Sequence, residues 1–170
     1  MSFLDLANKR YSVRAYKPDP VPDEVLAQVM EAARLAPTAA NRQPFRLIVI
    51  HTRGREEDLK RVYGRDWFLQ PPLVIAIVGL PDTGWVRGSD GANYTDVDAG
   101  IVFEHLTLAA ADLGLGTCWI GAFDPVAARQ VLGLPDDARP IAFTPLGYPA
   151  GEFRPKQRKP LEELVSYERW

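Results

Sequence analysis

Residues 10–14 are the first segment of the chain whose side chains could do chemistry. They read Arg-Tyr-Ser-Val-Arg. In an extended strand alternate side chains share a face, so Arg10, Ser12 and Arg14 would point the same way. Two guanidinium groups and a hydroxyl together suit a phosphate or another anionic oxygen group. A solvent-exposed basic strand edge is the simpler alternative, and both interpretations stay open for this segment alone.

Two further segments combine polar or glycine residues at a helix-to-strand junction. Residues 37–44 read Pro-Thr-Ala-Ala-Asn-Arg-Gln-Pro, where prolines stiffen both ends and Asn41 and Gln43 offer donors and acceptors. Residues 114–121 read Gly-Leu-Gly-Thr-Cys-Trp-Ile-Gly, where glycines let main-chain N–H groups come close to a ligand. Taken singly, each segment is better explained as an ordinary connection between a helix and a strand.

A fourth segment is strongly basic. Residues 154–160 read Arg-Pro-Lys-Gln-Arg-Lys-Pro, and the prolines favour a fixed path. A solvated tail is the usual meaning of such a run.

Sequence patterns for nucleotide and metal chemistry are missing. Gly114-Leu115-Gly116 follows a helix and precedes a strand, which is the wrong context for a dinucleotide-binding loop. With His51, His105 and Cys118 as the only histidines and cysteine, a monomer cannot assemble a zinc cluster. We interpret Cys118 as a buried inert thiol and His105 as a core or interface histidine. The difficult chemistry would therefore come from a cofactor.

Length and charge narrow the function classes. The chain has 170 residues, enough for one domain covering 1–170, and a formal net charge of −2. That balance disfavours nucleic acid and anionic membrane surfaces as partners. The longest apolar run, residues 73–80, is far shorter than the ~20 residues of a membrane helix. No secretory signal is visible and the lone cysteine allows no internal disulfide, so we expect a cytoplasmic protein.

The elements that must position these segments follow from hydrophobic periodicity and proline punctuation. We expect helices over residues 2–9, 22–36, 55–63, 96–113 and 125–132, strands over 45–51, 73–79 and 141–147, and a short strand or extended turn over 117–121. Thr95 and Asp98 suggest a capping box for the longest helix, which is apolar around much of its circumference. Residues 80–94 form a long turn-rich loop. The tail, 152–170, should pack on something else, such as a second copy.

In this order and spacing the four segments resemble the nitroreductase family of FMN-dependent flavoproteins. The matching patterns are R-x-S-x-R, P-[ST]-x-x-N-x-Q-P, G-L-G-T-C-W-I-G and K-x-R. The element order alone suggests a parallel α/β sheet. The resemblance instead implies an α+β fold with a mixed, largely antiparallel central sheet flanked by helices. It also implies a homodimer that exchanges its C-terminal extension and holds FMN at the subunit interface.

The resemblance also implies which residues contact FMN. They are Arg10, Tyr11, Ser12, Arg14, Pro37, Thr38, Ala39, Asn41, Gln43, Cys118, Trp119, Ile120, Gly121, Lys156 and Arg158. Arg10 and Ser12 would hold the phosphate and ribityl end, and the Lys156 and Arg158 pair would complete the phosphate site. The loop of Thr38, Ala39 and Asn41 would reach the flavin from the other subunit.

Two of these contacts would tune the ring. Arg14 would lie at the N1/C2=O edge and stabilise the anion of the reduced flavin. Main-chain N–H groups around Ile120 and Gly121 would approach N5 and O4. A ribityl contact from residues 55–70 is harder to place, with Lys60 or Arg61 as candidates.

The implied activity is ping-pong hydride transfer. NADH or NADPH would reduce the flavin at N5, and a nitroaromatic, a quinone or a similar small acceptor would then be reduced in its place. No side chain need act as an obligatory acid. The alternatives are a specialised flavin enzyme such as a reductive dehalogenase, or a flavin carrier or sensor without turnover. The loop 80–94, with Trp85, Arg87 and Tyr94, would stand in for a substrate lid.

Overall fold

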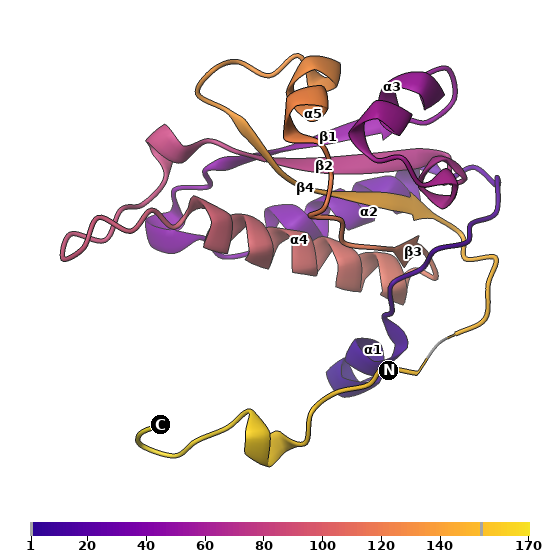
Figure 1. Cartoon of the computed structure of the whole chain (residues 1–170). Helices are drawn as coiled ribbons and strands as arrows, with labels where there is room; N and C mark the ends of the chain where they lie inside the picture. Colours follow the sequence, from indigo (N-terminus) through magenta and orange to yellow (C-terminus); the bar gives the residue numbers. More distant parts are fainter. Residues whose placement is uncertain (1, 154) are drawn as a thin grey trace.

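The computed structural model describes residues 2–153 and 155–170, and within them it has five α-helices and four β-strands (Figure 1). The helices are α1 (Phe3–Lys9), α2 (Asp23–Arg34), α3 (Glu56–Val62), α4 (Thr95–Asp112) and α5 (Pro125–Leu132). The strands are β1 (Phe45–His51), β2 (Leu73–Gly79), β3 (Gly116–Thr117) and β4 (Arg139–Gly147). Every helix and strand expected from the sequence is present, and only the strand expected over 117–121 is much shorter.

The sheet has the strand order β1-β2-β4-β3, and each neighbouring pair runs antiparallel. A parallel contact enters through the isolated bridge between Ser12 and Thr117. The mixed, largely antiparallel sheet is therefore confirmed. The parallel arrangement suggested by element order is wrong because β1 and β2 pair antiparallel although α3 lies between them in the chain.

The central strand β2 separates two hydrophobic cores. Leu73, Ile75 and Ile77 face the core shared with α2 and α4. Val74 and Ala76 face the opposite core, which contains residues of α3 and α5. Figure 1 shows α2 and α4 on one side of the sheet and α3 and α5 on the other. Every residue of β2 is buried, as expected for an unbroken apolar strand covered on both faces.

The start of α4 differs from the expected capping box. Thr95 is the first helical residue, and its N–H donates to Oδ1 of Asn93 at 2.9 Å. Asp98 does not reach back to the cap but accepts the N–H of Ala39 at 2.8 Å. The capping-box expectation is wrong because a residue outside the S/T-x-x-D pattern supplies the cap and tertiary packing engages the acid.

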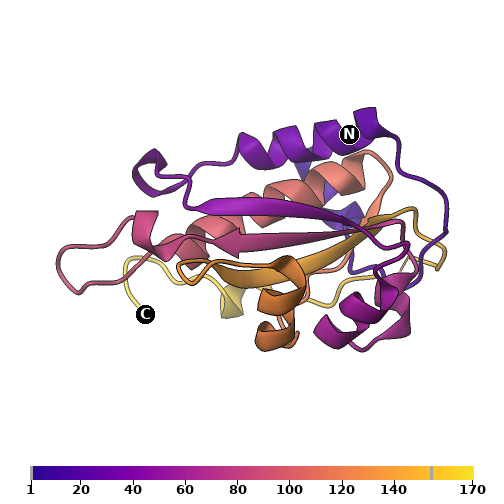
Figure 2. The same cartoon turned by 90° about the horizontal axis from the view of Figure 1, so that it is seen from above.

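Residues 80–94 form an ordered projection. After η3 (Pro81–Thr83) the chain turns back on itself, with a bridge between Val86 and Asn93. Trp85 packs edge-on against Tyr94, with ring centroids 4.9 Å apart, and the guanidinium of Arg87 lies over the Tyr94 ring. Figures 1 and 2 show this arm extending past the end of the sheet.

The C-terminal tail leaves the three-layered body. In Figure 1 it runs below α1 and ends well away from the sheet. Its large apolar side chains are exposed, namely Leu161, Leu164, Val165, Tyr167 and Trp170. The expectation that the tail does not join the core of its own chain is confirmed. Among the residues that the structure describes, no helix is long and apolar enough to cross a membrane.

Candidate functional site

The extended segment 10–16 is fixed to the sheet through its apolar residues. Val13 donates its N–H to the carbonyl of Thr117 at 2.9 Å and is buried. Its side chain fills the space beside Gly116, where an added Cβ would lie 2.8 Å from Val13 Cγ2. Tyr16 is buried as well, and its hydroxyl donates to the Val13 carbonyl. These anchors leave Arg10, Ser12 and Arg14 to point away from that packing.

The thiol of Cys118 lies near the polar residues of this segment. Burial raises the pKa of Cys118, while Arg14, a hydrogen bond with Ser12 and Arg10 each act to lower that pKa. The alternation of residues 10, 12 and 14 onto one face stays a prediction. Cys118 is 2% exposed, which confirms its interpretation as a buried thiol.

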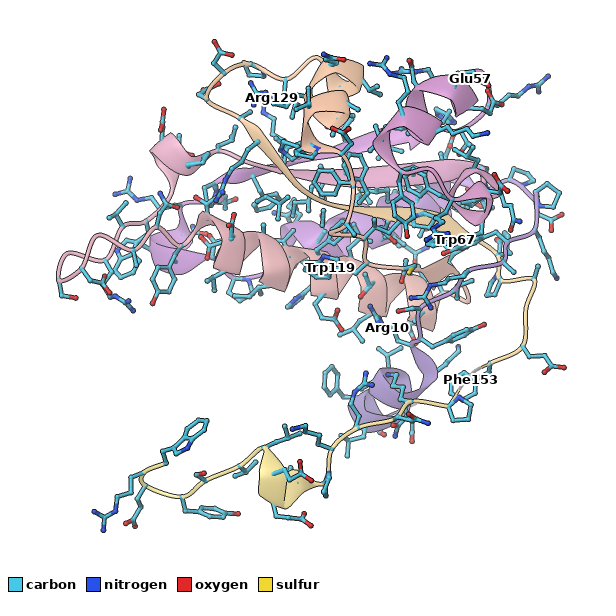
Figure 3. The ribbon with its side chains drawn as sticks, in the orientation of Figure 1. Arg10, Glu57, Trp67, Trp119, Arg129 and Phe153 are labelled. Atoms are coloured by element: carbon cyan, nitrogen blue, oxygen red, sulfur yellow. The ribbon has the colours of Figure 1, made fainter. Side chains whose placement is uncertain are left out.

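Arg10 is the centre of a cationic cluster. Its side chain is only 15% exposed, and its buried Nε has no hydrogen-bond partner among residues 2–153 and 155–170. Burial lowers the pKa of Lys156, and the neighbouring charges of Arg10 and Arg158 lower it further, while Glu104 opposes them. Figure 3 shows Arg10 lying between α4 and α1. The structure thus brings residues 10–14 close to the basic run of residues 154–160. Arg154 of that run lies outside the described residues.

Glu104 is the acid beside this cluster. Its Oε2 lies 4.0 Å from Nη2 of Arg10 and accepts the hydroxyl of Thr107 at 3.0 Å. Lys156 itself donates through Nζ to the carbonyl of Ala7 in α1. Sequence patterns gave no signal for Glu104, because an acid inside an apolar helix carries no motif.

Arg14 lies over an aromatic ring. Its guanidinium carbon is 5.9 Å from the ring centroid of Trp67, which belongs to η2 (Asp66–Leu69). Figure 3 shows where Trp67 lies relative to Arg10 and Trp119. Arg61, one of the two candidates from residues 55–70, instead donates to Oε1 of Gln130 in α5 at 2.7 Å. Two residues of this region reach the N-terminal segment: Trp67, a lone tryptophan with no motif around it, and Gln70, whose Oε1 accepts the N–H of Tyr16 at 3.0 Å.

The glycine-rich segment separates into structural and open positions. Gly114 ends α4 with φ of +79°, a conformation that favours glycine. Beyond β3 the ladder is interrupted because the N–H of Cys118 donates to the side chain of Thr144 and not to a backbone carbonyl. Gly121 is exposed, and a Cβ there would meet nothing within 4 Å.

The N–H groups of this segment correct one expectation. Ile120 donates its N–H to the Phe143 carbonyl at 2.8 Å, so that N–H is not available to a ligand. Because alternate N–H groups of an extended chain point to opposite sides, those of Trp119 and Gly121 point away from β4. Trp119 itself is 37% exposed and packs edge-on against Phe103.

The loop 37–43 contacts a different part of α4 from the one beside Arg10. Ala40, Asn41 and Gln43 all have φ near +50°, which costs about 1–3 kcal/mol for each non-glycine residue. Pro37 is exposed, and Thr38 accepts the Gln43 N–H through Oγ1 at 3.1 Å. The loop contacts Asp98 at the start of α4, whereas Arg10 lies near Glu104, about 9 Å further along that helix.

Two cavities of about 280 Å³ flank the extended segment. Tyr11, Val13 and Phe153 line both, and Tyr11 and Phe153 pack edge-on with centroids 5.2 Å apart. Each is slightly smaller than the roughly 300–1,000 Å³ of common small-molecule sites. In the part of the chain that the structure describes, no group of three or more His, Cys, Asp or Glu side chains is placed to hold a metal ion.

Comparison with known proteins identifies the family. The profile described as "Nitroreductase family" matches residues 7–64 and 54–148, so it covers the extended segment, the loop and the glycine-rich turn. The chain belongs to the nitroreductase family. A crystal structure of a nitroreductase family protein from Clostridium difficile 630 superposes on the whole chain with a TM-score of 0.91 and 39% identity, and the match covers 100% of both chains.

Two curated relatives place this nitroreductase family chain among oxidoreductases. A protein of Thermus thermophilus named NADH dehydrogenase is 30% identical over 94% of this chain and 92% of its own. A protein of Bacillus subtilis named FMN reductase [NAD(P)H] is 31% identical over 90% of this chain and 68% of its own. The nitroreductase fold found here is thus shared with chains named for nicotinamide and flavin chemistry.

Proposed function

We propose that residues 1–170 form one FMN-binding domain of an NAD(P)H-dependent oxidoreductase. The observation that carries this proposal is the cationic cluster of Arg10, Lys156 and Arg158, in which the buried Nε of Arg10 has no hydrogen-bond partner among the described residues. Membership of the nitroreductase family and the names of the relatives support the same assignment.

The cluster fits the phosphate of FMN. A phosphate monoester carries up to two negative charges and three strong acceptor oxygens, which charge-assisted hydrogen bonds hold well. The buried Nε of Arg10 is a donor without an acceptor in the described chain, and three cations there face one carboxylate, that of Glu104. Because a buried unpaired donor is costly, an anion at this point satisfies it.

The remaining contacts of this half of the site fit the flavin ring. We assign Arg14 to the N1/C2=O edge, where it would place positive charge, and the outward N–H of Gly121 to the N5 and O4 edge. FMN would supply the hydride chemistry at N5, so the protein would supply binding and electrostatics. Arg14 would stabilise the negative charge of the reduced ring.

The second half of the site comes from another copy of the chain. We assign Thr38, Ala39 and Asn41, with Gln43 behind them, to the flavin of the partner copy, because their loop contacts α4 about 9 Å from the position of the cluster. An apolar groove between α1, α2 and α4, lined by Phe3, Leu6, Ile101 and Leu108, offers a surface for a partner. The exposed apolar tail then packs on that partner, which gives a homodimer with an exchanged C-terminal extension. His105 lines the same groove, so its role is at the interface and not in the core.

The reaction is ping-pong, with the nicotinamide leaving before a nitroaromatic, a quinone or a similar acceptor binds. The projecting arm 84–94 is rooted beside the loop 37–43, because the N–H of Leu80 donates to the carbonyl of Pro44 at 2.9 Å. In the dimer this arm therefore lies near the acceptor side of the partner's flavin.

The test starts from the full chain stripped of flavin and titrated with FMN. We expect a yellow protein whose ~450 nm flavin band is bleached by NADH or NADPH under anaerobic conditions and returns when a quinone is added. A chain that takes up no FMN contradicts the assignment. A flavin band that neither nicotinamide bleaches indicates a carrier or sensor. An FMN-bound monomer in sedimentation contradicts the two-chain site.

A further inference from the structure

Asp98 is a buried carboxylate with an unusual environment. The residue is 1% exposed, and no cation lies within ion-pairing distance of it among residues 2–153 and 155–170. Its Oδ1 accepts the N–H of Ala39, and its buried Oδ2 has no partner in the same part of the chain. Burial of a charged group without a counter-ion is costly, so folding alone does not explain an acid here.

Helix α4 does not need Asp98 for its own start. The first N–H of the helix is capped by Asn93, and the N–H of Asp98 itself donates to the Tyr94 carbonyl in the ordinary helical pattern. Negative charge in the first turn suits the positive end of the helix dipole, which helps to retain the carboxylate at this position. The side chain is thus free to serve another element.

That element is the strained loop 38–43. Inside the loop, Asn41 donates its N–H to the carbonyl of Thr38, and Gln43 donates its N–H to the Thr38 hydroxyl. These bonds shape the loop but do not fix it to the body. The fixed points are Ala39, held by Asp98 of α4, and Pro44, held by Leu80.

We propose that Asp98 is a positioning residue that holds the loop 38–43 in the shape in which it closes the flavin site of a second copy. The inference rests on the proposed function, since it gives the loop its task. The hydrogen bond to Ala39 fixes the residue that directly precedes the left-handed positions Ala40 and Asn41. Without it, the loop loses its contact with α4 and relaxes out of the strained conformation.

The decisive variants are Asp98→Leu and Asp98→Asn. Leucine has a similar shape, removes the buried charge and leaves the Ala39 N–H without an acceptor. Asparagine keeps an oxygen that can accept that N–H and therefore tests rescue. Asp96→Leu is the matched control, because Asp96 lies two residues earlier on the same helix, is exposed and pairs with Arg139.

The first measurement is amide hydrogen exchange in the full chain without flavin. Asp98→Leu should speed exchange at Ala39 and Asn41 by about tenfold or more, while Asp98→Asn and Asp96→Leu stay within about threefold of wild type. Thermal unfolding in parallel separates positioning from stability, because a merely structural role moves the midpoint and not the loop. Unchanged loop exchange in Asp98→Leu overturns the inference, whether or not the chain binds FMN.

The second measurement is FMN titration with visible circular dichroism of the bound flavin. Asp98→Leu should weaken FMN binding by about tenfold and change the dichroism, and Asp98→Asn should restore both. Faster loop exchange with wild-type flavin binding would also overturn the inference, since the loop would then have no part in the site. Failure of the wild-type chain to bind FMN would instead count against the proposed function, and the exchange result would still be read by itself.

Discussion

Two carboxylates of helix α4 lie beside the two halves of the proposed site. Glu104 has a side chain that is 47% exposed and lies 4.0 Å from the guanidinium of Arg10. Asp98, six residues earlier on α4, is almost completely buried and accepts a main-chain N–H. The half beside Glu104 would bind the flavin through electrostatics, so its contribution should depend on charge and salt concentration. The half held by Asp98 would bind through geometry, so its contribution should depend on hydrogen-bond direction and backbone conformation.

Arg10→Ala is the most damaging change to the electrostatic half. Loss of charge-assisted hydrogen bonds to phosphate costs about 3 kcal/mol, so FMN binding should weaken roughly 100-fold. Titration of the flavin-free protein with FMN and with riboflavin measures it, because riboflavin lacks the phosphate and should be little affected. Arg139→Ala, which removes an arginine outside the cluster, is the control. Equal losses of affinity for FMN and for riboflavin would remove the distinction between the electrostatic and the geometric half.

Arg14→Ala should leave FMN bound but make it harder to reduce. Removing the cation beside the ring disfavours the reduced anion, and the two-electron potential should fall by on the order of 30 mV, equivalent to about 1.4 kcal/mol. Trp67→Ala should shift the potential in the same direction by less, because it frees the guanidinium without removing it. Redox titration against a reference dye measures both, and an unchanged potential in Arg14→Ala contradicts its place at the ring.

The pH dependence of binding should belong to the electrostatic half alone. The pKa of Lys156 is lowered by burial and by the charges of Arg10 and Arg158. Protonated Lys156 attracts phosphate, so affinity is complete below this pKa and falls as pH rises through it, earlier than for an ordinary lysine. Lys156→Arg keeps its charge and should flatten the alkaline fall in FMN affinity. The same fall in both proteins would assign the titration to another group.

Glu104→Gln should have the smallest effect on FMN affinity, and it should raise that affinity whereas Arg10→Ala lowers it. Partly exposed ion pairs contribute about 0.2–1 kcal/mol, so removal of this acid should tighten FMN binding by roughly threefold. Asp96→Asn, near the other end of the same helix where Asp96 pairs with Arg139, should have no effect. Because Asp98→Leu is expected to weaken binding, opposite signs for two acids of α4 would sharpen the comparison. Weaker binding in Glu104→Gln would show that Glu104 orients Arg10.

Much of the fold could be predicted because local patterns determine it. The apolar run of β2 and the proline-started α5 have the expected ends. These features depend on the periodicity of strand and helix or on residues within a few positions of one another.

The rest depends on partners that no spacing reveals. The Asp98 side chain has two choices, the cap of its own helix or an N–H 59 positions away, and only the packed chain decides between them. Likewise Ile120 loses its N–H to Phe143, a residue on another strand, so the motif alone could not tell it from Gly121. Trp67 was missed because a cation lying over an aromatic ring leaves no sequence pattern.

The hydrogen bond from Lys156 to Ala7 joins residues 149 positions apart, and it has a consequence for biosynthesis. A ribosome makes chain at about 5–20 residues per second, so the N-terminal arginines wait for seconds before Lys156 and Arg158 emerge. Contacts of such long sequence separation also form late in folding. If Lys156 and Arg158 complete the phosphate site as proposed, cofactor loading would follow translation, because the nascent chain would offer the flavin only part of that site.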